Sequence, residues 1–572
     1  LVATARFGYG SMPQRAPTAQ VCVGLPRVAA SPMEPRAAVV HWDAGAQQLR
    51  AWLSTQTPAR AKLELAMALG LAADAVQVIA PDVGGAFGGK ASVCPEDLML
   101  ASAARQLAQR EGWAQCALRW QATRGEDLQS APHGRASHSE GAIWLDAQGR
   151  IEALSAQFRF SLGHWLTYSA VVPARNAARI VPGPYQVAQC VAHAEARLSN
   201  AAAVGIYRGA GRPEAAILLE RLMDAAADEA GIDPLALRRR CVWPADALPR
   251  TLPNGQWLDR CDLPGLLDHA ADLFGYAAQR ARQASRRQQG QCVGVGMALY
   301  VEPCGQGPES VQLTALADGR YRLATGATAQ GQGRETSFAQ IAADALGCRP
   351  DQVDVLQGDT AQCPPGVGAL ASRSTAIGGS AVLGAAQALR ERLQAGQARP
   401  CTVDHVHTAE HEAWASGCVM VAVAVDVATG ELAIEDLVWV DDAGHVVHPA
   451  LVQGQLLGGL AQGLGQATME RVVYDDMGQL LTGSLMDYAL PRAADMPERV
   501  RLASHPTPSA ANPLGAKGVG EAGCIGVPAA LLNAALDALA PLGVRELDFP
   551  MSPGRLWQAI QDARPQAKPT PQ

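Results

Sequence analysis

Glycine-rich segments, most of them placed directly before an apolar helical pattern, are the feature that most limits how this 572-residue chain can fold. Besides DVGGAFGGKAS at 82–92, they are RGAGRPEA at 208–215, AIGGSAV at 376–382, QGQLLGGLAQGLGQA at 453–467 and GAKGVGEAG at 515–523. Single glycines between elements usually mark turns. Several such loops could also bring backbone N–H groups and helix N-termini around one large anionic ligand. Both interpretations stay open at this point.

The segment 82–92 has the spacing of a phosphate-binding P-loop, because its glycines and Lys90 fit G-x-x-x-x-G-K. Two features argue against that assignment. Ala91 stands where a P-loop needs Ser or Thr to hold magnesium. Pro95 predicts that the next helix begins about five residues later than the helix of a P-loop does. A nucleotide-binding ATPase therefore remains only as an alternative.

Composition and charge exclude other classes of function. The 47 basic and 54 acidic residues alternate without a basic block, and aromatic residues make up 5% of the chain, so nucleic acid is not expected as a partner. No apolar run reaches the ~18 residues of a membrane helix. The best candidate, 524–543, contains Pro528, Asn533, Asp537 and Pro541, and it predicts a buried amphipathic helix rather than a membrane segment.

Cysteine and histidine spacing gives no metal site. The 13 cysteines are scattered and form no CxxC pair, which is typical of reduced thiols in a core rather than of zinc or iron–sulfur motifs. His405, His407 and His411 have an HxHxxxH spacing that could bind zinc. No fourth ligand is evident nearby, so solvated loop histidines are the preferred interpretation.

Residues 48–90 predict a strand, a helix, a strand and then the glycine loop, and a further helix is expected from Pro95. Part of this pattern returns at 320–359. The Pro- and turn-rich stretch 241–265 predicts a domain boundary. We therefore expect one domain at 1–245, a second at 246–560 and a disordered tail at 561–572.

Five motifs, taken together and in this order, resemble the molybdopterin-binding large subunit of the xanthine dehydrogenase and aldehyde oxidase family: DVGGAFGGK, YRGAGRPEA, AQGQGRET, GSLMDYALPRAADMP and NPLGAKGVGEAG. The resemblance implies an α+β fold of two successive molybdenum-cofactor-binding domains, each with mixed sheets and packed helices, and the cofactor buried between them. The chain starts LVATARFGYG without an initiator Met, and the family's N-terminal α/β domain is expected to be missing.

The resemblance also implies which residues surround the cofactor. Around molybdenum, although not as direct side-chain ligands, it places Gln56, Phe87, Arg208 and Gly459. It assigns further cofactor contacts to Gly85, Ala86, Gly88, Gln330, Gly331, Gln332, Gly333 and Gly520, with the SRSTAIGGS segment beside the pterin and its diphosphate tail. The glycines would then let the backbone approach the metal centre, and Lys90 would need no phosphate.

Glu521, in GVGEAG, matches the general base of the family. A carboxylate held between glycines in a dry pocket is suited to that role, because burial disfavours the charged form. The alternative is that Glu521 only caps the apolar helix that follows.

Departures from the family pattern narrow the expected substrate. Ala91, Ala210 and, with less certain correspondence, Gly368 replace the glutamate and two aromatic residues of xanthine-oxidising members, and Gly209 replaces the cysteine of carbon monoxide dehydrogenases. With Ala369 these residues predict a roomy pocket for an aldehyde or an N-heteroaromatic ring. Arg212 is either a pocket residue or the structural partner of Glu214 or Glu220.

The chain has neither iron–sulfur spacing nor a flavin fingerprint, so electrons must leave through other subunits. The resemblance implies a small [2Fe–2S] subunit and a medium FAD subunit in a dimer of heterotrimers, and a cofactor in the cytosine dinucleotide form. It also implies a cytoplasmic location, with the periplasm as the alternative. A non-catalytic homologue acting as an assembly partner is a further alternative.

Overall fold

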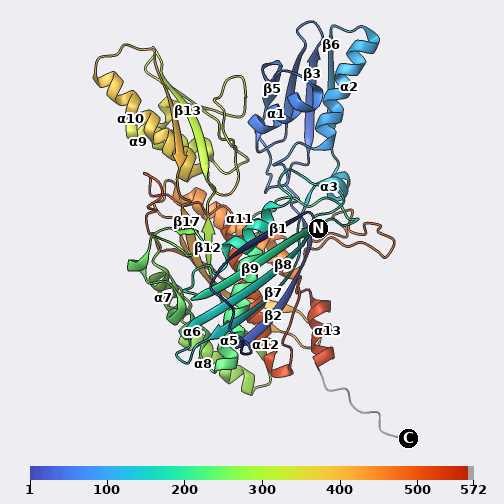
Figure 1. Ribbon diagram of the computed structural model, residues 1–572, viewed down its shortest axis with the longest axis vertical. Coiled ribbons are helices and arrows are strands. Elements are labelled where there is room, and N and C mark those ends of the chain that lie inside the picture. Colours follow the sequence, from blue (N-terminus) through green and yellow to red (C-terminus); the bar gives the residue numbers. More distant parts are fainter. Residues whose placement is uncertain (564–572) are drawn as a thin grey trace.

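The computed structural model describes residues 1–563. A body of two mixed sheets and their helices carries two lobes, one around residues 37–121 and the other around residues 307–409 (Figure 1). Each lobe has a four-stranded sheet of its own. Mixed sheets with packed helices confirm the α+β class expected from the sequence.

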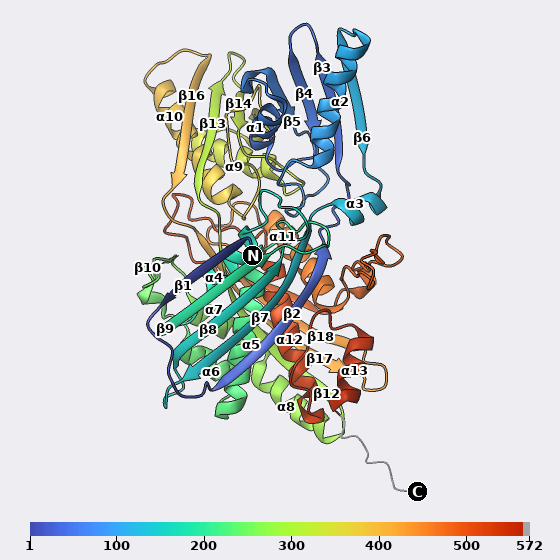
Figure 2. The same ribbon diagram turned by 45° about the vertical axis from the view of Figure 1, so that its right-hand side comes forward.

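The first half of the chain builds one body sheet and one lobe. Its strands are β1 (Ala3–Tyr9), β2 (Ala19–Ala29), β3 (Ala37–Asp43), β4 (Gln48–Leu53), β5 (Val76–Ile79), β6 (Gln115–Gln121), β7 (His133–Leu145), β8 (Ile151–Ser161) and β9 (Gln189–Arg197), and its helices are α1 (Pro58–Leu69), α2 (Pro95–Glu111), α3 (Arg124–Ser130), α4 (Val172–Ile180), α5 (Arg212–Ala230) and α6 (Pro234–Cys241). The body sheet has the order β1-β9-β8-β7-β2 (Figure 2). The lobe sheet, β5-β4-β3-β6, is inserted between β2 and β7.

The local predictions for this half are confirmed. The strand, helix and strand expected before the glycine loop are β4, α1 and β5, and α2 begins at Pro95 as its cap pattern indicates. Proline at the first helical position is favoured because its missing N–H would have no intrahelical partner there. Gly112 ends α2 in the left-handed region, with φ of 67°.

The second half repeats this plan. After the connecting elements β10 (Arg250–Thr251), β11 (Trp257–Leu258), α7 (Leu263–Phe274) and α8 (Tyr276–Gln288) come β12 (Cys292–Pro303), β13 (Gly307–Ala315), β14 (Tyr321–Thr325), α9 (Arg334–Leu346), β15 (Val353–Leu356), α10 (Ser380–Gln394), β16 (Cys401–Ala409), β17 (Trp414–Val425), β18 (Leu432–Asp442), α11 (Pro449–Thr468), β19 (Val500–Ser504), α12 (Ala522–Leu539) and α13 (Pro553–Ala563). The body sheet is β12-β17-β18-β19, and the lobe sheet β15-β14-β13-β16 is inserted between β12 and β17.

Strand directions show that the repeat covers whole halves. In the body sheets only the pairs β8–β9 and β18–β19 are parallel, and in the lobes only β4–β5 and β14–β15 are parallel. Helix α5 packs on β2 and β7, and α12 packs on β12 and β17. The partial repeat expected from the sequence therefore extends to both sheets and to the helix that closes each half.

Helices α5 and α12 pack against each other at the centre of the body. Helix α12 is long and apolar enough to cross a membrane, but nearly all of its side chains are buried in the fold. The predicted burial is confirmed, whereas the predicted amphipathic character is wrong, because the fold surrounds the helix on all sides. Strand β12 comes close to it through Gly294, where an added Cβ would lie 1.9 Å from the carbonyl oxygen of Ala534. This spacing leaves no room for a side chain on β12 there.

Three predictions need correction or stay open. His405 and His407 lie in strand β16 rather than in a loop, because β16 pairs with β13, and His405 packs against Gly384 of α10. Residues 561–563 of the expected tail form the last turn of α13, and 564–572 lie outside the described residues. The boundary after residue 245 stays a prediction, since one apolar cluster contains side chains from both halves.

Replacing Gly294 with Ala should destabilise the fold. The new methyl group would displace the backbone of α12, which costs ~3 kcal/mol for an overpacked core. Thermal and urea unfolding would measure the loss. Gly554→Ala is the matched control, because nothing lies within 4 Å of its Cβ position and Ala favours the helix. Equal stability of the two variants would contradict the packing described here.

Candidate functional site

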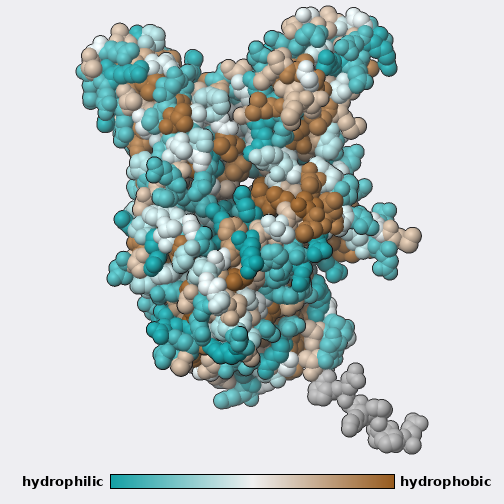
Figure 3. All heavy atoms as spheres, in the orientation of Figure 1, coloured by the Kyte–Doolittle hydropathy of each residue, from teal (hydrophilic) through white to brown (hydrophobic). Residues whose placement is uncertain are grey.

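A cavity of about 870 Å³ lies where both lobes meet the body. The lobes project as separate knobs with a notch between them (Figure 3). Of the predicted site residues, the cavity wall contains Gln56, Ala86, Phe87, Gly88, Arg208, Ala210, Gln330, Gly331, Gln332, Ala369, Gly520 and Glu521. Gly85, Gly209, Gly333, Gly368 and Gly459 are not on the wall and lie in the adjoining chain. Segments separated by hundreds of residues thus meet at one place.

The glycine loop at 82–92 presents its backbone to this cavity. Gly85, Phe87 and Gly88 all have positive φ, of 90°, 51° and 100°. An added Cβ on Gly88 would lie 2.6 Å from the carbonyl oxygen of Ile206, so only glycine fits there. The resulting turn places Phe87 on the cavity wall, with 37% of its surface exposed.

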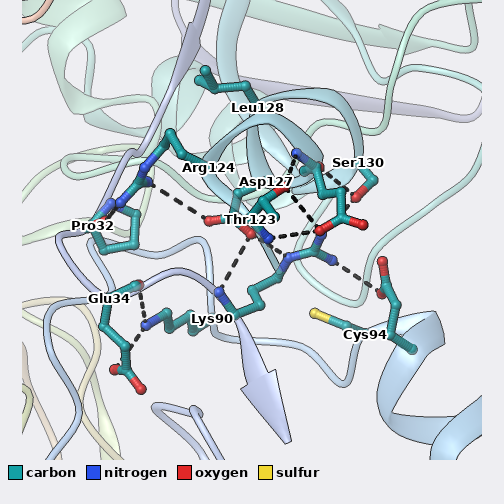
Figure 4. A network of polar contacts seen from close by, with 12 residues as sticks. Pro32, Glu34, Lys90, Cys94, Thr123, Arg124, Asp127, Leu128 and Ser130 are labelled. Carbon is teal, nitrogen blue, oxygen red and sulfur yellow. Dashed lines mark hydrogen bonds and ion pairs between the residues drawn. The ribbon is translucent and has the colours of Figure 1, made fainter. Parts of the chain in front are cut away.

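Lys90 points away from the cavity and into a polar network at the base of the lobe (Figure 4). It is buried, and its Nζ donates to the backbone oxygen of Glu34 at 2.8 Å and pairs with the Glu34 carboxylate at 3.1 Å. Burial is the main cause that lowers the pKa of Lys90. A lysine committed in this way cannot bind a nucleotide's phosphates, and the P-loop alternative is wrong.

Gln56 links the two halves across the cavity. Its Oε1 accepts a hydrogen bond from the N–H of Gly88 at 3.0 Å, and its Nε2 donates to the carbonyl oxygen of Ala369 at 2.7 Å. Gly368, with φ of 92°, passes so close that an added Cβ would lie 2.2 Å from the Gln56 carbonyl oxygen. The amide therefore fixes the glycine loop of one half against a loop of the other.

Arg208 is the polar hub of the site. Its backbone N–H donates to the carbonyl oxygen of Phe87 at 3.0 Å. Its buried guanidinium donates to Gln462 Oε1 at 2.9 Å, to the Gln455 carbonyl oxygen at 3.1 Å and to the carbonyl oxygen of Gly520. The guanidinium also lies 5.7 Å from the ring centre of Phe87. One side chain thus orders the glycine loop, helix α11 and the segment before α12.

Gly459 lies on α11, one layer behind the wall. A Cβ at this position would lie 3.1 Å from the backbone of Gly523 in α12 and 3.6 Å from the guanidinium carbon of Arg208. Its absence lets α11 approach α12 closely.

The loop before α9 and the segment before α10 form the wall contributed by the second lobe. Gln330 donates through its Nε2 to Thr328 at 2.9 Å, and Gln332 accepts from the N–H of Gln330 at 2.5 Å. Gly333, the N-cap residue directly before α9, has φ of 73°. In the SRSTAIGGS segment, Ser374–Gly379 forms a π-helical turn, a geometry that is common at functional sites.

This wall suits a pterin cofactor that brings its own metal ligands. Gly331 and Gly454 leave open space where a Cβ would stand, so a flat ligand could lie against the backbone there. Gln332, Gln455 and Gln462 offer amide donors and acceptors for pterin heteroatoms. Within residues 1–563 no group of three or more His, Cys, Asp or Glu could hold a metal ion, so a metal at this site would depend on sulfurs of the cofactor.

Glu521 occupies the residue before α12, and its carboxylate makes no capping hydrogen bond. The capping alternative is therefore wrong. Instead, Oε2 lies 3.0 Å from Nη1 of Arg212. Its side chain is 11% exposed and lies on the cavity wall. A nearly buried carboxylate facing a cavity is placed to accept a proton from a molecule bound there.

Arg212 is a pocket residue, as one of the two sequence interpretations held. Its guanidinium also donates to the carbonyl oxygens of Pro303 and Gly209. The other interpretation is wrong within the described residues, because Glu220 pairs with Arg238 at 2.9 Å and Glu214 lies 3.9 Å from Arg135. The sequence alone could not separate these partners.

Glu302 is a site residue that the sequence analysis missed. It is fully buried at the end of β12 and accepts a hydrogen bond from the N–H of Glu521 at 3.2 Å and another from Ser372. Burial, and then the charge of Glu521, raise the pKa of Glu302 to about 8. The available signal was a single carboxylate inside the otherwise apolar strand CVGVGMALYVEP.

The predicted substrate pocket is lined by small residues. Ala210 has φ of 39° between Gly209 and Gly211, which both lie in the left-handed region, and it shares the cavity wall with Ala91 and Ala369. Bulky side chains therefore do not fill this part of the cavity.

Comparisons with known proteins give the relatives of this chain. Two family models, both described as molybdopterin cofactor-binding domains, match residues 11–242 and residues 269–408 and 398–497. The 6-hydroxypseudooxynicotine dehydrogenase complex subunit gamma of Paenarthrobacter nicotinovorans is 30% identical over 93% of this chain and 72% of its own length. The nicotine 6-hydroxylase large subunit of the same organism is 28% identical over 94% and 72%. The crystal structure of quinoline 2-oxidoreductase from Pseudomonas putida 86 matches with a TM-score of 0.90 and 30% identity, over 96% of this chain and 76% of that one.

Replacing Arg208 with Lys should loosen the site without unfolding the body. The lysine ammonium cannot reproduce the guanidinium hydrogen bonds to Gly520, Gln455 and Gln462. The free energy of unfolding should fall by ~2 kcal/mol. Hydrogen exchange should become faster at 515–523 and stay unchanged in α5. Arg110→Lys, at an exposed position, is the control. Unchanged exchange at 515–523 would refute the hub role of Arg208.

Proposed function

The chain belongs to the family of molybdopterin-binding large subunits of the xanthine dehydrogenase and aldehyde oxidase type, and from this we propose that it oxidises an aldehyde or hydroxylates a carbon of an N-heteroaromatic ring, with water as the source of oxygen. The chain is a molybdenum-dependent oxidoreductase. The observation that carries the proposal is Glu521, whose nearly buried side chain lies on the wall of a cavity bordered by glycine backbone.

When bound, the molybdenum cofactor supplies two-electron redox chemistry. The residues of this chain accept the proton, position the site and exclude water. Glu521 accepts the proton at its carboxylate, and Arg212 forms an ion pair with that carboxylate at 3.0 Å. Arg208 and Gln56 fix the backbone around the cavity. The apolar surroundings of α12 exclude water from behind the base.

An N-heteroaromatic substrate has support from two sides. Two of the similar proteins are named for nicotine and quinoline, and both compounds contain an aromatic ring nitrogen. In this chain, Ala91 and Ala210 stand where xanthine-oxidising members carry a glutamate and an aromatic residue, and Gly209 provides no thiol. A wall of small residues leaves space for a fused ring and lacks the contacts that would favour a purine or carbon monoxide.

Further parts of the proposal concern partners. The similar proteins named above are themselves a large subunit and a complex subunit, which supports separate electron-transfer subunits here. We propose a small [2Fe–2S] subunit and a medium FAD subunit in a dimer of heterotrimers. The cofactor would be the cytosine dinucleotide form, in a cytoplasmic enzyme.

Glu521→Gln should lower turnover about 10²- to 10⁴-fold, because the amide cannot accept the proton. The variant should keep its molybdenum content, since Glu521 does not hold the cofactor. Steady-state kinetics and elemental analysis of the complex purified with its partner subunits would measure both quantities. Glu431→Gln, in an exposed turn, is the matched control. Full activity of Glu521→Gln, or a wild-type complex without molybdenum, would overturn the proposal.

A substrate panel tests the ring specificity. Quinoline or benzaldehyde should reduce the wild-type complex, whereas kcat/KM for xanthine should be ~100-fold lower, because polar and stacking contacts worth ~1–3 kcal/mol each are missing. Naphthalene, which lacks the ring nitrogen, is the matched control for quinoline. Xanthine as the best substrate in this panel would show that the small wall residues do not set specificity.

A further inference from the structure

Two carboxyl groups meet behind the catalytic cavity, and only one of them has a role in the proposed reaction. Glu302, at the end of β12, has no exposed surface, and its Oε1 accepts the backbone N–H of Glu521 and the hydroxyl of Ser372. The other oxygen, Oε2, has no hydrogen-bond partner. A buried carboxyl with an unpartnered oxygen is costly to keep unless it serves the residue beside it.

A single guanidinium serves this pair of carboxyls. Arg212 reaches Glu521 Oε2 with Nη1 at 3.0 Å, and it uses its remaining donors for the carbonyl oxygens of Pro303 and Gly209. Pro303 directly follows Glu302 in β12, so the same strand end holds both the second carboxyl and the guanidinium. Within residues 1–563, Glu302 forms no ion pair, whereas Glu521 has Arg212 at 3.0 Å.

We propose that Glu302 is a positioning residue for Glu521: it holds the backbone N–H of Glu521 and leaves the Arg212 guanidinium to the Glu521 carboxylate. The proposal depends on the role of Glu521 in the proposed function. Two carboxyls this close in a buried site do not readily carry two charges. Below the raised pKa of Glu302, about 8, its carboxyl is neutral and the pair holds one negative charge.

Charged and titratable groups face Glu302 from several elements. Arg212 faces it from α5, Glu521 from the turn before α12, and Ser372 from the loop before α10. Cys304 and Tyr300, on the same strand segment, have pKa values raised by burial and stay neutral. The charge of Glu412, in the loop before β17, helps to raise the pKa of Arg212.

Ionisation of Glu302 should therefore disturb the base. Above pH 8 a second negative charge would compete with Glu521 for Arg212, and kcat/KM should fall by up to tenfold per pH unit. The sign follows from the raised pKa: the neutral form, which leaves Arg212 to Glu521, predominates below about 8 and is lost above it.

The experiment compares pH profiles of the wild-type complex with those of Glu302→Gln, Glu302→Ala and Ser372→Ala. Glu302→Gln keeps an acceptor for the Glu521 N–H and cannot ionise, so its profile should stay flat above pH 8. Glu302→Ala should lower kcat about tenfold at pH 7, and Gln at the same position should restore it. Ser372→Ala removes a donor that favours the ionised form, so the decline should move to higher pH.

Infrared difference spectra give a readout that needs no turnover. Wild type minus Glu302→Gln should show a carboxylic-acid C=O band at pH 7 that disappears above pH 8. An active wild type whose pH profile matches that of Glu302→Gln, or a missing acid band, would overturn the inference alone. A molybdenum-loaded wild type that oxidises no aldehyde or azaarene would instead overturn the proposed function. If Glu302→Gln loads no molybdenum, an unshifted Ser372→Ala profile contradicts the inference.

Discussion

The packing of α5 against α12 is the constraint on which the site depends. Each helix closes one half of the chain, and the segment directly before each helix opens on the cavity. Arg208, four residues before α5 begins, donates to Gly520, two residues before α12. Helices of this length hold their N-termini rigidly once their sides are buried, so the base and the hub keep a fixed separation. A shift of either helix would therefore change the position of Arg208 relative to Glu521.

Duplication of the fold explains why one cavity gathers so many loops. Gln56 precedes α1 in the first lobe and Gln330 lies before α9 in the second, at equivalent points of the two halves. Both are on the cavity wall. Two similar halves packed through their equivalent helices bring equivalent loops face to face, and a flat ligand can lie between them. A single half would offer only one side of such a site.

Buried charges in this protein fall into two kinds. Arg238 has no exposed surface and is matched with Glu220 at 2.9 Å and Asp224 at 2.7 Å. The attraction within such pairs roughly offsets the desolvation of their charges. At the cavity, by contrast, Arg212 faces two carboxyls. One positive charge then faces two carboxyl groups, which favours keeping a proton on one of them. This excess of carboxyl groups makes proton transfer possible at the cavity.

The sequence by itself determined the elements whose signals are local. Periodicity and caps placed β4, α1, β5, α2 and the buried helix α12, and five ordered motifs identified the cofactor family and several residues of the cavity wall. Only the tertiary structure decided the partner of Arg212, the strand position of His405 and the role of Glu302. The physical reason is separation along the chain: the hydrogen bond between Glu302 and Glu521 joins residues 219 positions apart, and that from Gln56 to Ala369 spans 313. No local pattern encodes such contacts, because they form only when segments far apart in the chain pack together.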